Sequence, residues 1–438
     1  MSSKQQTGRK TIERPVYIVD GARTPFLKVR GRPNPFSPVD LAVQCGRALL
    51  LRLGLPPGAI DQVILGCVNV LAGEMNPARL AALRLGLGEG MRAFTVQINC
   101  GSGMQSIDTG LRMIREGSRE LVLAGGSEAL SHAPLQFRRQ AVEWLAEIRG
   151  AGSLKKRAGK LTELRPDFFK PVIALQQGLT DPVVGMSMGE TAELLGHLFR
   201  VGRKAADEYA VLSHKRLARA QEEGVFADEI APLFSSDGEQ FTADDGVRAD
   251  SSPESLAKLP AVFERPFGQV TAGNSSQVTD GASWVILASE AALKKYRLSP
   301  LARLVDSDWS ALDPQIMGLA PVLGVTRLLQ HLNLERQQVD LWEINEAFAV
   351  QVLACLKAWQ DADFCRDFLG LEQPFGEIGQ DCLNIDGGAI SLGHPVGTSG
   401  NRIVLHLARA MQRRELSRGI ATECIGGGQA GAMLLESV

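Results

Sequence analysis

The feature that most constrains this fold is an order of segments that occurs twice along the chain. In each half, short apolar runs closed by turn residues alternate with longer stretches whose apolar residues recur at helical spacing. The first half predicts strands at 15–23, 61–68, 93–100 and 120–126, and helices at 38–53, 76–87 and 104–116. The second half predicts strands at 301–306, 339–345, 382–386 and 420–425, and helices at 318–332, 346–359 and 396–414. Strands that alternate with helices predict an α/β fold with a largely parallel sheet.

The repeated order indicates an internally duplicated protein. Residues 61–66 match 339–344 in position, and 120–126 match 420–427, weakly in letters but in the same order. At 438 residues the chain is too long for one ordinary core. We therefore predict a first half at 1–130 completed by 277–298, an inserted domain at 131–276 and a second half at 299–438. The active site is expected between the two halves.

Helix ends are marked clearly at 38–53. Ser37 is the expected cap, Pro38 suits the first helical position, Asp40 lies in the first turn, and Gly54 follows the last turn.

Composition excludes several classes of protein. The net charge of -2 argues against a nucleic-acid binder, so no nucleic-acid partner is expected. Seven widely spaced cysteines give no disulfide framework, and no His/Cys cluster has the spacing of a metal site. The polar N-terminus lacks a secretory signal, and no apolar run is long enough to span a membrane. A cytoplasmic location and a reaction without metal or cofactor are the expectations.

Reactive side chains stand where strands end. Cys100 lies between a strand and a helix, where backbone N–H groups and the helix dipole favour an anion and would lower the thiol pKa. His394 is flanked by Gly393 and Pro395, and Cys424 precedes a glycine run whose N–H groups could face an oxyanion. Asn345 follows an apolar strand. Each alone is more often structural, and the other five cysteines are assigned to the core.

Together these segments resemble the thiolase family. The resemblance runs from about residue 16 to residue 435 and rests on five motifs in the family's order: 99–103, 271–276 with 280–282, 345–348, 393–395 and 424–427. It implies a duplicated, five-layered αβαβα fold with a loop domain inserted in the first half. The implied activity is that of an acyl-CoA C-acyltransferase, which cleaves 3-ketoacyl-CoA with coenzyme A or condenses two acetyl-CoA. Coenzyme A is then a substrate.

The resemblance also implies roles for single residues. Cys100 would take the acyl group, His394 would activate it, and Cys424 would move the proton at the α-carbon of acetyl-CoA. Asn345, through a water, and His394 would form one oxyanion hole; the N–H groups of Cys100 and Gly426 would form the other. The expected contacts with the pantetheine arm of coenzyme A are Ser276, Phe348, Ala272 and Met317.

The chain also departs from the family pattern. Ser187 stands where short-chain members often carry histidine, and two aromatic-bearing insertions resemble those of thiolases in fatty-acid oxidation complexes. The ending around Cys424 resembles the acetyl-CoA acetyltransferases. Acyl chain length and reaction direction therefore stay open. Two alternatives are a decarboxylating ketoacyl synthase, which would use one cysteine with two histidines, and a non-catalytic acyl-CoA or lipid-binding relative.

Residues 136–170 carry nine Lys or Arg against four Asp or Glu. Within them, Phe137, Ala141, Trp144, Leu145 and Ile148 are predicted to share one helical face. This segment could contact a partner subunit or an anionic membrane surface, or form a solvated basic face near the approach of coenzyme A. The resemblance further implies a homodimer or a dimer of dimers.

Overall fold

The computed structural model describes residues 14–56 and 58–438, so the polar segment 1–13 lies outside them. The elements of the first half are β1 (Val16–Arg23), α1 (Pro38–Leu53), β3 (Gln62–Gly66), α2 (Pro77–Arg84), β4 (Ala93–Val96), α3 (Ser102–Arg115), β5 (Leu121–Ala129) and β10 (Thr279–Ser289). Those of the second half are β11 (Ala302–Ala311), α11 (Ala320–Leu332), β12 (Leu341–Ile344), α12 (Ala349–Gln360), α13 (Ala362–Leu369), α15 (Val396–Arg414), β13 (Arg418–Ile425) and β14 (Gln429–Glu436).

Helix α1 begins and ends where the sequence predicts. The Ser37 side chain accepts the N–H of Asp40, the Asp40 side chain reaches back to the Ser37 backbone, and Gly54 takes the left-handed conformation with φ 60°. Local capping chemistry therefore accounts for both ends of this helix, and Glu74 adds an acceptor for the N–H of Val39 at 3.1 Å.

Within the described residues, ten strands form one sheet that records the duplication. The main path runs β4-β3-β5-β10-β1-β11-β14-β13-β12, and the short β2 (Leu27–Lys28) pairs with β10. The first five strands come from the first half and the last four from the second. Strand β3 pairs in parallel with β5, as β12 does with β13. Within the sheet of the described residues, the two halves join where three residues of β1 pair with β11.

Two expectations about the sheet are wrong. The sheet is mixed, because β10 and β14 run antiparallel to their neighbours, and β14 returns directly from β13 through the turn at Gly427 and Gly428. Residues 382–386 do not form a strand and make a single bridge from Leu383 to Trp342. The chain turns away from the strand β12 at Asn384, which has a positive φ of 45°. From there the side chain of Asn384, and not the backbone of a following residue, hydrogen-bonds to the backbone of Ile344.

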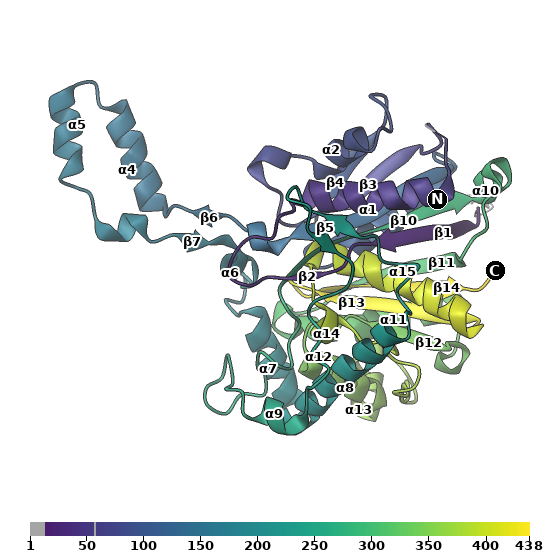
Figure 1. Cartoon of the computed structure of the whole chain (residues 1–438). Coiled ribbons are helices and arrows are strands. Elements are labelled where there is room, and N and C mark those ends of the chain that lie inside the picture. Colours follow the sequence, from purple (N-terminus) through teal and green to yellow (C-terminus); the bar gives the residue numbers. More distant parts are fainter. Residues whose placement is uncertain (1–13, 57) are drawn as a thin grey trace, which may run out of the picture.

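Three separate hydrophobic clusters show that the fold has five layers. Val63 and Leu65 of β3 pack on α1 and α2, whereas Ile64 between them faces the helices α3 and α15. This alternation is the period of two that a strand imposes. Helices α11 and α12 cover the second half with the third cluster. Helices α3 and α15 thus pack on each other in the centre, between the strands of the two halves. In Figure 1, α1 and α2 cover the first half and α11 and α12 the second.

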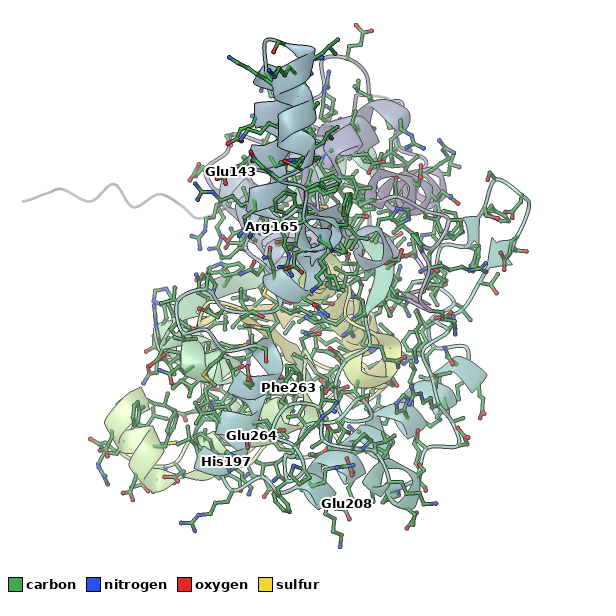
Figure 2. The ribbon with its side chains drawn as sticks, turned by 90° about the vertical axis from the view of Figure 1, so that its left-hand side faces the viewer. Glu143, Arg165, His197, Glu208, Phe263 and Glu264 are labelled. Carbon is green, nitrogen blue, oxygen red and sulfur yellow. The ribbon has the colours of Figure 1, made fainter. Side chains whose placement is uncertain are left out.

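The inserted segment has two parts. The helices α7 (Met188–Leu198), α8 (Arg203–Glu222) and α9 (Pro253–Ala257) pack near the second half. The other part, which we name the arm (135–173), projects far from the body and holds β6 (Leu135–Gln136), α4 (Arg139–Gly150), α5 (Leu154–Leu161), η3 (Pro166–Phe169) and β7 (Val172–Ile173) (Figure 1). In Figure 2 the arm carries Glu143 and Arg165 well apart from His197 and Glu264 on the body.

The prediction of one apolar helical face in the arm is only partly correct. Ala141 is buried, and Trp144 donates its indole N–H to the Lys160 carbonyl at 2.8 Å and packs against Phe168. Phe137 and Leu145, in contrast, are 61% and 46% exposed. Phe137 precedes the helix, and α5 is too short to cover the whole apolar face of α4. In the described part of the chain, no helix combines the length and apolar character needed to cross a membrane.

Candidate active site

Two cavities adjoin each other near the C-terminal ends of β4 and β13. The larger has a volume of about 740 Å³ and is lined by Cys100, Asn99 and Gly426. The smaller, of about 460 Å³, is lined by His394, Ala272, Ser276 and Phe348. Both cavities are walled by the same six residues, Leu130, Leu175, Leu179, Thr180, Met188 and Val396. The predicted nucleophile and the predicted base therefore face adjoining spaces.

Cys100 lies in the tight turn between β4 and α3. Asn99 before it has a positive φ of 46°, and the Ser102 hydroxyl donates to the Asn99 carbonyl at 2.7 Å while accepting the N–H of Ile98 at 2.9 Å. These bonds fix the half-buried thiol at the start of a central helix.

The resting Cys100 thiol is a weak acid. Burial first, and then the charge of Glu423, raise its pKa to about 12, while the N–H groups of Gly426 and of Cys100 itself act in the opposite direction. The expectation that the helix terminus lowers this pKa is wrong, because the loss of hydration outweighs the dipole. Cys100 consequently needs a neighbouring base before it can attack.

His394 has the geometry of that base. Its backbone N–H donates to the Gln277 carbonyl at 2.9 Å, and its Nδ1 lies 2.6 Å from the Ser399 hydroxyl. Because Ser399 donates to the Pro395 carbonyl at 3.3 Å, its oxygen is left to accept a proton held on Nδ1. Burial and Arg402 lower the pKa of His394 to about 4, so the ring is neutral at physiological pH. The Nε2 atom, buried and unpartnered among the described residues, then keeps its lone pair.

Cys424 and Asn345 lie deeper in the site. Cys424 is buried in β13 against Met317 and Ala347, and burial, then Cys100, raise its pKa well above the ordinary value. Asn345 is fully buried, yet neither polar atom of its side chain has a partner among the described residues. Such an amide is costly unless a water or substrate atom completes it. Gly426 is fixed by its carbonyl, which accepts from the Asn99 side chain at 2.9 Å.

The structure therefore brings most of the predicted residues to these two adjoining cavities. Met317 is the exception on the coenzyme A side, because it packs with Cys424 and lines neither cavity. Cys424 and Asn345 likewise lie behind the cavity walls. Ser187 lines the smaller cavity and also caps α7 by accepting the N–H of Glu190.

Comparison with known families identifies the family to which this fold belongs. The family model described as "Thiolase, N-terminal domain" matches residues 16–291, and the one described as "Thiolase, C-terminal domain" matches residues 298–437. The chain belongs to the thiolase family. It is an acyltransferase, and the alternative of a ketoacyl synthase is not supported by these matches.

Relatives align with this thiolase over nearly its whole length. The mitochondrial 3-ketoacyl-CoA thiolase of Mus musculus is 38% identical over 97% of this chain and 98% of its own length. The mitochondrial trifunctional enzyme subunit beta of Bos taurus is 32% identical over 100% of this chain and 92% of its own. A crystal structure of human mitochondrial 3-ketoacyl-CoA thiolase in complex with CoA has a TM-score of 0.83 at 36% identity, covering 97% of this chain and 98% of that one.

Three residues of this thiolase site escaped the sequence reasoning. Ser399 orients His394, Met188 lies between the two cavities with its sulfur close to Gly426, and Glu423 is a buried carboxyl beside both thiols. Ser399 and Met188 carry no signal in the sequence. Glu423 does, because a charged residue within the apolar strand 420–425 is unusual.

A buried network of charged side chains lies along the central helix α15, next to the site. His406 of α15 bonds to Glu229 at 2.8 Å and lies 3.4 Å from Asp386, and Arg402 one turn earlier lies 3.4 Å from Glu343. Burial alone would lower the pKa of His406, but Glu229 and Asp386 raise it to about 10. Opposing the effect of burial, His406 lowers the pKa of Glu229 to about 2. The network ties the inserted segment to the central helix.

Proposed function

We propose that the chain is a 3-ketoacyl-CoA thiolase that works through an acyl-cysteine on Cys100. The observation that carries this proposal is that Cys100 lines one of two adjoining cavities and a neutral His394 the other, with Cys424 buried close to Cys100. Within the described residues, the Nε2 atom of His394 has no hydrogen-bond partner. A thioester or ketone carbonyl is attacked best by a thiolate, and a covalent intermediate divides one difficult step into two.

Each residue then has a defined part in the reaction. His394 Nε2 takes the proton of Cys100, whose sulfur attacks the C3 carbonyl carbon of the 3-ketoacyl-CoA. The bond between C2 and C3 breaks, and the electron pair left on C2 takes a proton from Cys424, which releases acetyl-CoA. The proton on His394 then passes to the Cys424 thiolate, which restores both groups. The thiol of a second coenzyme A gives its proton to His394 and attacks the acyl group on Cys100, and the Cys100 sulfur that leaves takes this proton back from His394. Asn345, Gly426 and the Cys100 N–H hold the oxyanions.

The smaller cavity fits the pantetheine arm and the larger one the acyl chain. Ala272, Ser276 and Phe348 line the smaller cavity, whereas apolar side chains such as Val68, Leu130 and Val183 line the larger. A space of about 740 Å³ exceeds what an acetyl group fills, which favours longer acyl chains.

Thiolysis rates across a series of 3-ketoacyl-CoA lengths test this proposal. The expected result is a kcat/KM that rises beyond the four-carbon substrate, together with an acyl adduct on Cys100 in the intact-protein mass. A preference for acetoacetyl-CoA would contradict the assignment of the larger cavity, and a label on another cysteine would contradict the mechanism.

A homodimer or a dimer of dimers is proposed for the assembly. Strand β4 ends the sheet and has a free edge within the described residues, and its four side chains are only half-buried. An unpaired edge is a template for another strand. We expect β4 to pair with β4 of a second copy. Light scattering that shows an active monomer at assay concentration would contradict this.

The arm is proposed to dock a partner subunit. It exposes apolar side chains, with Leu135 at 67%, Phe137 at 61% and Phe169 at 65%, on a basic segment that projects from the body. A relative named as a trifunctional enzyme subunit supports this proposal. Replacing Phe137 and Phe169 by serine should abolish co-purification of the partner. The control is the same change at Phe234 of β8 (Leu233–Phe234), which is exposed beside α1. Binding to anionic vesicles at low salt instead would point to a membrane surface.

The cytoplasmic location, and a reaction without metal or redox cofactor, stay predictions. The relatives named above are mitochondrial proteins, and their names say nothing of the compartment of this chain.

A further inference from the structure

A carboxyl group is enclosed behind the nucleophile. Glu423 of β13 is fully buried, and its side chain points toward the two central helices. A Cβ at Gly400 of α15 would overlap its Oε1 and would also press on the Cβ of Met104 in α3. Glu423 therefore occupies the narrow space between the first turns of α3 and α15, and the glycine at position 400 makes room for it.

This carboxyl has no hydrogen-bond partner. Within the described residues, neither Oε1 nor Oε2 finds a donor. Arg402 of α15 is the cation that favours its charge, but its Nη1 is directed to Glu343 at 3.4 Å. An ionised carboxylate that is buried without donors is strongly destabilising, and such a group takes up a proton instead. Burial accordingly raises the pKa of Glu423 well above its ordinary value.

The groups that face Glu423 connect it to catalysis. Met104, beside it, lies four residues after Cys100, so the carboxyl is about one helical turn behind the thiol. Cys424 is its neighbour along β13, and the charge of Glu423 opposes ionisation of both thiols. Arg402 is the charged group on α15, and the strand β14 brings Gly431 opposite Glu423 and no titratable side chain.

We propose that Glu423 is a positioning residue for the known reaction: a carboxylic acid held protonated behind Cys100, whose ionisation shuts the nucleophile off. The proposal rests on the role of Cys100 given above and goes beyond it. While Glu423 is neutral, Cys100 can give its proton to His394 with no second negative charge behind it. When Glu423 loses its proton to solvent at higher pH, the thiolate and the carboxylate repel across a poorly hydrated interior.

The consequence is that the titrations of Glu423 and Cys100 are coupled, and that the coupling raises the pH at which the thiol ionises. Glu423 and Cys100 compete for one negative charge, so the apparent ionisation of the thiol moves to higher pH than it would beside a neutral side chain. For two unit charges about 8 Å apart at an effective dielectric constant of about 20, Coulomb's law gives an effect of about thirtyfold on the ionisation equilibrium. At neutral pH, where the carboxyl is protonated, removing it should change little.

The test compares Glu423→Gln and Glu423→Leu with the unaltered enzyme. Glu415→Gln removes the same formal charge at an exposed site just after α15 and is the matched control. The measurement is the rate of alkylation of Cys100 by iodoacetamide, followed by peptide mass mapping, from about pH 6 to about pH 10, a range that brackets the ordinary thiol pKa.

We expect both Glu423 variants to match the parent within about twofold near neutral pH and to react at least about tenfold faster in the alkaline range. The proposal also predicts that kcat/KM of the parent falls at alkaline pH, and that this fall is absent from both Glu423 variants. Glu415→Gln should follow the parent throughout. Unchanged profiles in both Glu423 variants would overturn the inference. An acceleration already at neutral pH would overturn it too, because the carboxyl would then be ionised at rest. Cys100→Ala separates the two proposals: if that variant still turns over, the proposed function fails instead.

Discussion

Replacing Ser399 by alanine tests how the site makes a base of His394. The Ser399 hydroxyl is the group that meets Nδ1, at 2.6 Å, and the ring is buried, so alanine leaves a proton on Nδ1 without an acceptor. An unsatisfied buried donor costs about 1–3 kcal/mol. The free energy of the other tautomer, with its proton on Nε2, therefore falls by that amount relative to the active one. In this tautomer Nε2 cannot accept the proton of Cys100.

The expected result is a loss of about 5- to 150-fold in the rate of Cys100 acylation, because each 1.4 kcal/mol is a factor of ten in the population of the active tautomer. The assay is the appearance of the acetyl adduct by intact-protein mass after rapid mixing with acetyl-CoA, at saturating substrate. Substrate binding should change little, since the Ser399 hydroxyl faces the ring and not the cavities.

Ser106→Ala provides the matched control for this experiment. Ser106 is equally buried in a central helix, and among the described residues its hydroxyl bonds to the Gly103 carbonyl alone, at 2.7 Å. It should lose stability comparable to that of Ser399→Ala and retain the parent acylation rate. An acylation rate for Ser399→Ala that equals that of Ser106→Ala would refute the tautomer argument.

Three other predictions follow from the same site and fold. Cys100→Ala should abolish both the acyl adduct and turnover. Cys424→Ala should still be acetylated on Cys100 and still exchange acetyl with coenzyme A, while its condensation rate falls about 100- to 10,000-fold. An equal loss in both half-reactions would contradict the separation of roles. The raised pKa of His406, about 10 against an ordinary 6.5, contributes stability that is fully present below pH 6.5 and is lost as pH rises toward 10. Denaturant unfolding should show this decline, and His406→Gln should flatten it. Replacing the arm (135–173) by a short linker should remove partner binding and leave the melting temperature of the body within a few degrees, because the arm adds little to the buried core; a large fall would show that it is structural.

Much of the fold is determined by local sequence. The ends of α1 follow from Ser37, Asp40 and Gly54, because capping bonds join residues three or four positions apart. The order of strands and helices, and its repetition, follows from hydrophobic period, which each segment carries by itself. The motifs around Cys100, His394 and Cys424 likewise place reactive side chains at the ends of such segments.

Only the tertiary structure decides what those segments and side chains meet. Strand direction depends on partners far along the chain, so the antiparallel β10 and β14 and the single bridge at Leu383 were not predictable from period. The pKa of Cys100 was predicted with the wrong sign, because the sequence shows the helix terminus but not the loss of hydration or the carboxyl of Glu423 behind it. Burial and electrostatic fields are properties of the assembled interior, which residues distant in sequence build together.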